Sequence, residues 1–291
     1  MTPDSNAPSI SDDCMSAVEY VLLQPDPVKK ADQSIALYTQ WQTLSDAERE
    51  SVLAKETTSV VVKLQEPGRP LKPELVDAKF LARRGLGSQA GRIALLHSLA
   101  HIEFNAINLA LDAVYRFRDM PIDYVTEWLK VASDEGEHFL LLLNRLRELG
   151  SNYGELNAHT GLWDMALRTD HDVLVRMALV PRILEARGLD VAPPMIKKLQ
   201  AQGDSDSADI LQRIYTDEIT HVLVGNRWFR HVCDERELDG ASVFRDLLAG
   251  PSSAYLRSPF NDEARLQAGF TVEEMQVIRE MEMEYRAAEV N

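Results

Sequence analysis

The chain has 291 residues, of which 45% are hydrophobic, so it can bury the core of one large domain or two small ones. No run approaches about 18 consecutive apolar residues, and the polar, acidic N-terminus lacks a signal-peptide pattern, so we expect a cytoplasmic protein without a membrane span. The net charge of −15 disfavours non-specific binding to nucleic acids and anionic membranes.

The first 85 residues are predicted to form an accessory region. Asp26-Pro27 combines an N-cap residue with a proline at the first helical position, which predicts a helix to about Gln42. Residues 66–73 contain three prolines and are expected to form an extended linker. Cys14, in a segment expected to be loose, and Cys233, at a predicted helix end, are interpreted as incidental thiols.

The next part of the chain has the apolar periodicity of four long helices. Their predicted ranges are about Ser88 to Phe117, Ile122 to Leu149, Trp163 to Arg187, and Ser205 to Cys233. Gly150 and Gly188 are predicted to end the second and third helices. A loop is expected at 151–162, a short amphipathic stretch at 194–202, and one or two shorter helices in the tail at 241–291.

These elements predict an all-α protein with a four-helix bundle. The first two helices are joined by a short turn, whereas the link from the second to the third is long. That order is the ferritin-like connectivity, with one long crossover. The predicted division is an accessory region and linker at 1–85, the bundle at 86–238, and a C-terminal helical tail packed on the bundle at 239–291.

Carboxylates on the apolar stripes of these helices repeat at a nearly constant interval. Glu103 precedes Glu135 by 32 positions, and Glu185 precedes Glu218 by 33 positions. Both second members begin a Glu-x-x-His sequence, whose two side chains lie about 60° and one turn apart on a helix. The helices are thus interpreted as two copies of one hairpin that face each other around a metal site.

The predicted ligands are four carboxylates and two imidazoles, the set described for di-iron and di-manganese bundles. They are Glu103, Glu135, His138, Glu185, Glu218 and His221. Four carboxylates neutralise two divalent cations, and this oxygen-rich set favours iron, with manganese as the alternative, over structural zinc. Exposed acidic helix faces are the simpler alternative, which the paired spacing disfavours.

Five stretches resemble a known family. "LLHSLAHIEFNAINLALDAVYRF", "GSNYGELNAHTGLWD", "VPRILEARGLDVAPPMI", "DEITHVLVGNRWFR" and "SPFNDEARLQAGF" are similar to a bacterial family of ferritin-like proteins known as a domain of unknown function. The resemblance covers about residues 67–270. It implies the fold and the metal site of the ferritin-like di-iron carboxylate superfamily, and it implies no substrate.

Four further residues are candidates for contacts to the ligands or to a substrate. Tyr215 could approach the metals, although a core tyrosine with a bonded hydroxyl is the favoured interpretation. Asp217 could orient an imidazole or be solvated. Arg182 and Arg187 could hold an anionic substrate, although structural pairing is favoured.

Two other features lie close to the predicted ligands. His97 and His101 point away from Glu103 by helical geometry and are interpreted as a packed or capping pair. Pro181 lies four positions before Glu185 and is expected to kink the third helix.

The favoured function is oxidation or hydroxylation of an unknown small molecule by a non-haem di-iron oxidase or oxygenase. The expected partners are the substrate, O₂, an electron donor and a second copy of the chain in a homodimer, but no nucleic acid. Metal handling by ferroxidation, storage or peroxide detoxification is the first alternative, and the accessory region argues against a cage subunit. A second alternative is a binding module in which the metals only join the helices. A narrower enzymatic alternative is hydroxylation of a modified tRNA base, which the negative net charge disfavours.

Overall fold

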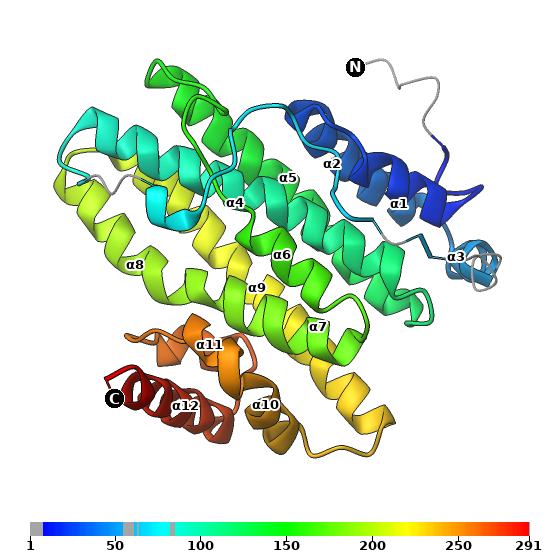
Figure 1. Ribbon diagram of the computed structural model, residues 1–291. Coiled ribbons are helices and arrows are strands. Elements are labelled where there is room, and N and C mark those ends of the chain that lie inside the picture. Colours follow the sequence, from blue (N-terminus) through cyan, green and yellow to red (C-terminus); the bar gives the residue numbers. More distant parts are fainter. Residues whose placement is uncertain (1–7, 55–60, 63, 82–84, 291) are drawn as a thin grey trace. The chain divides into compact units, whose positions relative to one another are not determined.

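The structure is a computed structural model that describes residues 8–54, 61–62, 64–81 and 85–290. In that part of the chain every regular element is helical, apart from one isolated bridge between Leu75 and Ala158 (Figure 1). This confirms the all-α prediction. The first helices are α1 (Cys14–Leu22), α2 (Pro27–Thr43), α3 (Asp46–Ala54), η1 (Ala78–Phe80), α4 (Gln89–Arg116), α5 (Ile122–Glu148) and α6 (Gly161–Arg168). They are followed by α7 (Val173–Leu179), η2 (Val180–Glu185), α8 (Ala186–Ala201), α9 (Ser205–Glu235), α10 (Gly240–Leu248), η3 (Gly250–Tyr255), α11 (Asp262–Gln267) and α12 (Val272–Val290).

The packing divides the chain into two compact units, Met1–Leu167 and Arg168–Asn291. The first contains the α4–α5 hairpin with α1 and α2 packed on it, and the second contains α8 and α9 with the C-terminal helices. The division of the chain at residues 85 and 238 stays a prediction. Each helix in the described residues is too short or too polar to span a lipid bilayer.

The hairpin of the first unit has the predicted boundaries. Ser88 accepts a hydrogen bond from the Gly91 amide at 3.1 Å and caps the start of α4. After α5, Gly150 has a φ of +79°, and the Ser151 amide donates to the Leu146 carbonyl at 2.9 Å. This is the bonding pattern of a Schellman cap, which favours glycine because φ is positive. The predictions for both helices are therefore confirmed.

The accessory helix α2 lies against α5 at a very close approach. A Cβ at Gly136 would lie 2.9 Å from the Ala31 carbonyl oxygen, so only glycine permits this contact. Further along, the Trp41 indole donates to the Thr126 hydroxyl at 2.8 Å. Because Gly136 lies within the first Glu-x-x-His sequence, α2 supports the helix segment that carries Glu135.

A buried lysine joins the accessory region to α4. Nζ of Lys30 donates to the carbonyl oxygens of Leu22 at 2.9 Å and Gly68 at 2.6 Å, and to Oδ1 of Asn108. Burial holds the pKa of Lys30 well below its usual value. Three acceptors match the three protons of the ammonium group, so one side chain connects α1, the linker and α4.

Replacing Lys30 with methionine is expected to lower the free energy of unfolding by about 2–4 kcal/mol, because two buried acceptors and one part-buried acceptor lose their common donor. Urea denaturation measures the change. Lys29→Met is the matched control, because Lys29 is exposed on the same helix and its replacement should change stability by less than about 0.5 kcal/mol. Equal effects of the two substitutions would contradict the role of Lys30.

Two histidines of α4 hold the loop that follows α5. Nε2 of His97 accepts from the Gly154 amide at 2.9 Å. Nε2 of His101 donates to the His159 carbonyl at 3.0 Å, which leaves Nδ1 to accept from the Tyr153 hydroxyl at 2.9 Å. Both rings are buried, so the interpretation as a packed pair is confirmed.

Burial lowers the pKa of His101 to about 4, against 6.5 for an unperturbed histidine. Between these two pH values the folded chain therefore binds fewer protons than the unfolded chain. The neutral His101 ring contributes stability that is present above pH 6.5 and lost as the pH falls towards 4. We expect the His101 contribution to the free energy of unfolding to fall by about 2 kcal/mol between neutral pH and about pH 5. In His101→Gln the total decrease over this range should therefore be about 2 kcal/mol smaller, as measured by urea denaturation at both pH values. An equal loss in both proteins would contradict the assignment.

The prediction of a third helix from Trp163 to Arg187 is wrong. α6 ends at Arg168, and a new helix starts where Asp172 accepts from the Leu174 amide at 2.8 Å. Gly188 does not end a helix either, because α8 continues to Ala201. The separate stretch predicted at 194–202 is part of α8.

A tertiary contact explains how α8 continues through two prolines. Pro193 has no amide proton to donate to the Leu189 carbonyl, which would be its helical partner. The Asn261 side-chain amide donates to that carbonyl at 3.1 Å instead. The helix therefore keeps this acceptor satisfied, which the local sequence does not reveal.

Other predictions for the C-terminal half and the cysteines have mixed outcomes. α9 starts at Ser205 as predicted and runs two residues further than expected, to Glu235. The tail holds α10, η3, α11 and α12, more helices than expected. Cys14 was expected in a loose segment, but it begins α1 and is buried, and both cysteines are free thiols.

Candidate metal centre

The first unit brings three predicted ligands together inside the α4–α5 hairpin. Each of Glu103, Glu135 and His138 offers a ligand atom, and these atoms lie within 4.8 Å of one another. Nδ1 of His138 lies 3.3 Å from Oε2 of Glu135 and 3.6 Å from Oε2 of Glu103. The three residues are at most 3% exposed, so the group is enclosed by protein.

The electrostatics of this group favour a bound cation. Burial raises the pKa of Glu103 well above its usual value, the nearby Glu135 carboxylate raises it further, and His138 lowers it. Oε2 of Glu103 accepts no hydrogen bond from the described residues. Two buried carboxylates this close repel each other unless a proton or a cation lies between them. The donor set therefore fits a divalent metal ion.

The second unit carries the matching Glu-x-x-His sequence on α9. Nδ1 of His221 lies 3.8 Å from Oε1 of Glu218, which confirms that the two side chains share one face. His221 is 1% exposed and the Glu218 side chain is 13% exposed. This pair repeats the arrangement of Glu135 and His138 on α5.

Glu185 lies at the end of η2, which is a π-helical turn. The turn begins beside Pro181, so the kink predicted there takes the form of one wide helical turn. Such turns occur often at functional sites, because they change the direction of the side chains that follow. Glu185 is therefore carried by a π-helical turn, and Pro181 was the one sequence signal of an irregular helix there.

A close contact sets the level of Glu185 along α9. A Cβ at Gly225 would lie 2.3 Å from Cβ of Pro181, so glycine is needed where the proline ring meets α9. The short link at residues 202–204 makes the two helices antiparallel. Glu185 lies four residues after Pro181, and His221 lies four residues before Gly225. Because the helices run in opposite directions, Glu185 and His221 lie at the same height along the helix pair.

The two arginines near Glu185 contact other groups of the second unit. Arg182 is fully buried, pairs with Glu274, and lies over the rings of Phe229 and Phe244 at 4.0 and 3.8 Å from their centroids. Nη1 of Arg187 donates to the Arg257 carbonyl at 2.5 Å. These contacts agree with structural pairing, the interpretation that the sequence favoured.

The remaining two candidates also have partners within the second unit. The Tyr215 hydroxyl accepts from the Asn261 side-chain amide at 3.1 Å, as expected of a tyrosine with a bonded hydroxyl, and the residue is half-buried. Asp217 lies 3.8 Å from Arg213, and its side chain is 36% exposed, so it resembles a solvated surface carboxylate. Sequence reasoning missed Gly136 and Gly225, although each is a glycine in the interior of a predicted helix, which often marks a close contact.

Comparisons with known proteins place the chain in a family. A family model described as "Protein of unknown function (DUF455)" matches residues 23–276, a range that includes all six predicted ligands. The chain is similar to an uncharacterized protein of Haemophilus influenzae, with 44% identity over 220 residues that cover 73% of this chain and 76% of that protein. No solved structure matches the chain. The chain therefore belongs to the DUF455 family of proteins of unknown function.

Proposed function

We propose that this protein is a ferritin-like metalloprotein that binds two metal ions with ligands from two helical hairpins. The buried group of Glu103, Glu135 and His138 is the observation that carries the proposal. Glu218 and His221 repeat the motif on α9, and Glu185 reaches the level of His221. In the proposal each hairpin supplies two carboxylates and one imidazole, as in di-iron carboxylate bundles.

The chemistry of the ligands supports iron, with manganese as the alternative. Four carboxylates balance two divalent charges, and one imidazole per metal suits these ions better than structural zinc. Two iron ions at this place would supply O₂ activation for the oxidation or hydroxylation of a small molecule.

The protein's own residues would position the ligands and exclude water. Ala100 and Ile107 lie on the same stripe of α4 as Glu103 and are fully buried, which keeps the environment of the carboxylates dry. Gly136 and Gly225 let neighbouring segments approach α5 and α9 closely, which fixes the ligand helices. Both features suit a site that must hold several like charges in place.

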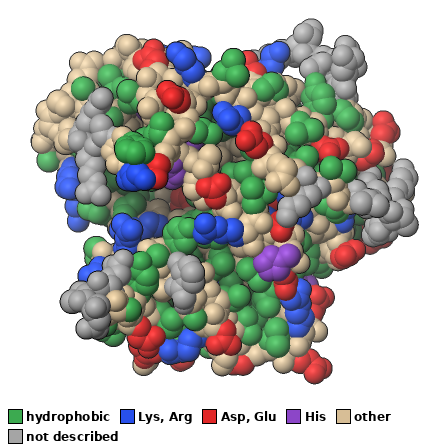
Figure 2. All heavy atoms as spheres, in the orientation of Figure 1, with side chains coloured by type: hydrophobic (Ala, Val, Ile, Leu, Met, Phe, Trp, Pro, Cys, Tyr) green, Lys and Arg blue, Asp and Glu red, His purple; other side chains and the backbone are tan. Residues whose placement is uncertain are grey.

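The proposed partners follow from chemistry and charge. On the face drawn in Figure 2, the described Lys and Arg side chains are interspersed with Asp and Glu, which together with the net charge of −15 disfavours a nucleic-acid partner. A small-molecule substrate, O₂ and an electron donor are the proposed partners, and a homodimer in the cytoplasm is the proposed setting.

Anaerobic titration of the metal-free chain with Fe(II), followed by addition of O₂, tests the proposal. The proposal predicts saturation at about two iron ions per chain and rapid oxidation of both. Binding without O₂ reactivity would support metals that only join the helices, and a large hollow assembly in gel filtration would support iron storage. Failure to bind iron would contradict the proposal.

A further inference from the structure

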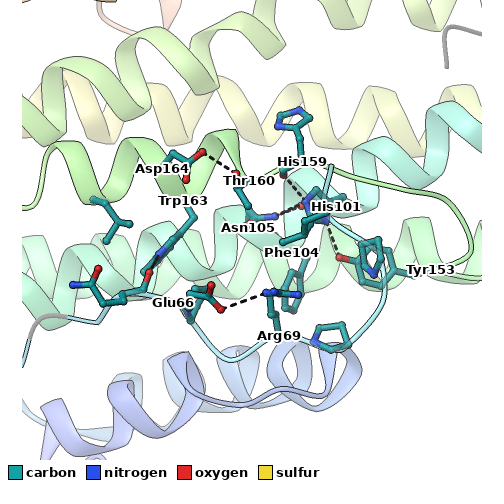
Figure 3. Close-up of a pocket in the computed structure, with 16 residues that line it drawn as sticks. Glu66, Arg69, His101, Phe104, Asn105, Tyr153, His159, Thr160, Trp163 and Asp164 are labelled. Carbon is teal, nitrogen blue, oxygen red and sulfur yellow. Dashed lines mark hydrogen bonds and ion pairs between the residues drawn. The ribbon is translucent and has the colours of Figure 1, made fainter. Parts of the chain in front are cut away.

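A second candidate site lies in the first unit, on the face of α4 opposite Glu103. It is a cavity of about 150 Å³, and its α4 wall contains His101, Phe104 and Asn105 (Figure 3). His101 and Asn105 each lie about 160° from Glu103 around the helix axis. The helix itself therefore separates this cavity from the proposed metal ligands.

Aromatic side chains give the cavity the dimensions and character of a ring-binding pocket. Figure 3 shows Trp163 and Tyr153 at its two ends with Phe104 between them. The Trp163 indole donates to the Gln65 carbonyl at 2.8 Å, and the Tyr153 hydroxyl is bonded to His101 at 2.9 Å. Because the polar tips are occupied, the parts of the Trp163 and Tyr153 rings that face the cavity are apolar, and a cavity of this volume has room for a benzene ring.

The linker side of the cavity carries both signs of charge. Nε of Arg69 lies 3.8 Å from Oε2 of Glu66, and the two side chains are 38% and 71% exposed. No other contact with a described residue holds the Arg69 guanidinium in a hydrogen bond or ion pair. So loose and exposed a pair contributes little to stability, and both groups remain able to bind a ligand.

We propose that this cavity binds a small aromatic molecule that carries both a carboxylate and an amino group, as an aromatic α-amino acid does. The ring lies between Trp163 and Tyr153, against Phe104. The carboxylate pairs with Arg69 and the ammonium group pairs with Glu66. The ligand thereby fastens the linker to α4, at a place distinct from the proposed metal centre.

Calorimetric titration of the full chain with L-phenylalanine tests the proposal, using two analogues with the same ring. Phenylethylamine lacks the carboxylate, and 3-phenylpropionate lacks the amino group. We expect saturable binding of one phenylalanine per chain, and binding of each analogue weakened at least about tenfold. Equal binding of all three compounds, or no binding of phenylalanine, would overturn the proposal.

Single substitutions test which charged group of the ligand Arg69 and Glu66 each bind. Arg69→Gln should weaken phenylalanine binding about tenfold and leave phenylethylamine unchanged, whereas Glu66→Gln should leave 3-phenylpropionate unchanged. Lys79→Gln is the matched control, because Lys79 is an exposed cation paired with Asp77 outside the cavity lining. Leu167→Trp should fill the cavity and abolish binding, with folding checked by circular dichroism. Unchanged phenylalanine binding in Arg69→Gln would also overturn the proposal.

Discussion

Replacing Glu135 with glutamine is expected to abolish binding of the metal pair and to stabilise the metal-free chain. Burial raises the pKa of the Glu103 carboxyl, and the Glu135 charge, which the amide removes, raises it further. Because that pKa lies above its value in the unfolded chain, stability is lost as the pH rises above about 4.5, and the substitution should reduce this loss. We expect the free energy of unfolding at neutral pH to increase by about 1 kcal/mol or more, measured by urea denaturation of metal-free protein.

Glu137→Gln provides the matched control for that experiment. Glu137 belongs to the same Glu-x-x-His segment but is only half-buried, and helical geometry turns its side chain away from Glu135. Its replacement should leave the metal content unchanged and shift stability by less than about 0.5 kcal/mol. If Glu135→Gln keeps two metal ions, or if Glu137→Gln loses them, the ligand assignment on α5 is wrong.

Replacing Gly225 with alanine is expected to destabilise the chain by about 1–3 kcal/mol, although alanine normally favours a helix interior. The new Cβ would lie 2.3 Å from Cβ of Pro181, and the proline ring cannot rotate away from it. The π-helical turn must then shift along α9, which moves Glu185 relative to His221. Thermal unfolding measures the loss of stability, and iron titration measures the accompanying loss of metal affinity.

Gly188→Ala is the control for this substitution. No atom lies within 4 Å of a Cβ built at Gly188, which is in the interior of α8. Alanine should therefore stabilise the chain there by about 0.5–1 kcal/mol. Stabilisation by both substitutions would show that the contact between Pro181 and Gly225 is not as close as the structure indicates.

The sequence predicted helices best where their ends are encoded locally. α4 starts after the N-cap Ser88, and α5 ends just before Gly150, because capping depends on residues within one turn. The C-terminal end of the third long helix was predicted wrongly because the helix continues with the help of a distant residue. Asn261 supplies the hydrogen bond that Pro193 cannot, so a proline that usually ends a helix does not end this one.

The grouping of Glu103 with Glu135 and His138 was predicted from spacing, because two side chains on one helix face can lie beside a third on the neighbouring antiparallel helix. The supporting contacts could not be predicted in this way. Lys30 lies in the accessory region, and its burial against Asn108 depends on how α2 packs. Gly136 was visible as a glycine within a helix, but the identity of its partner, Ala31, required the fold.

The most direct test of the central claim is the metal content of the chain purified from iron-fed cells, compared with that of the His138→Ala/His221→Ala double variant. The proposal predicts about two iron or manganese ions per chain in the unaltered protein and a metal content close to background in the variant. Metal content at background in the unaltered protein, or the same content in both proteins, would contradict a metal centre built on the two Glu-x-x-His motifs.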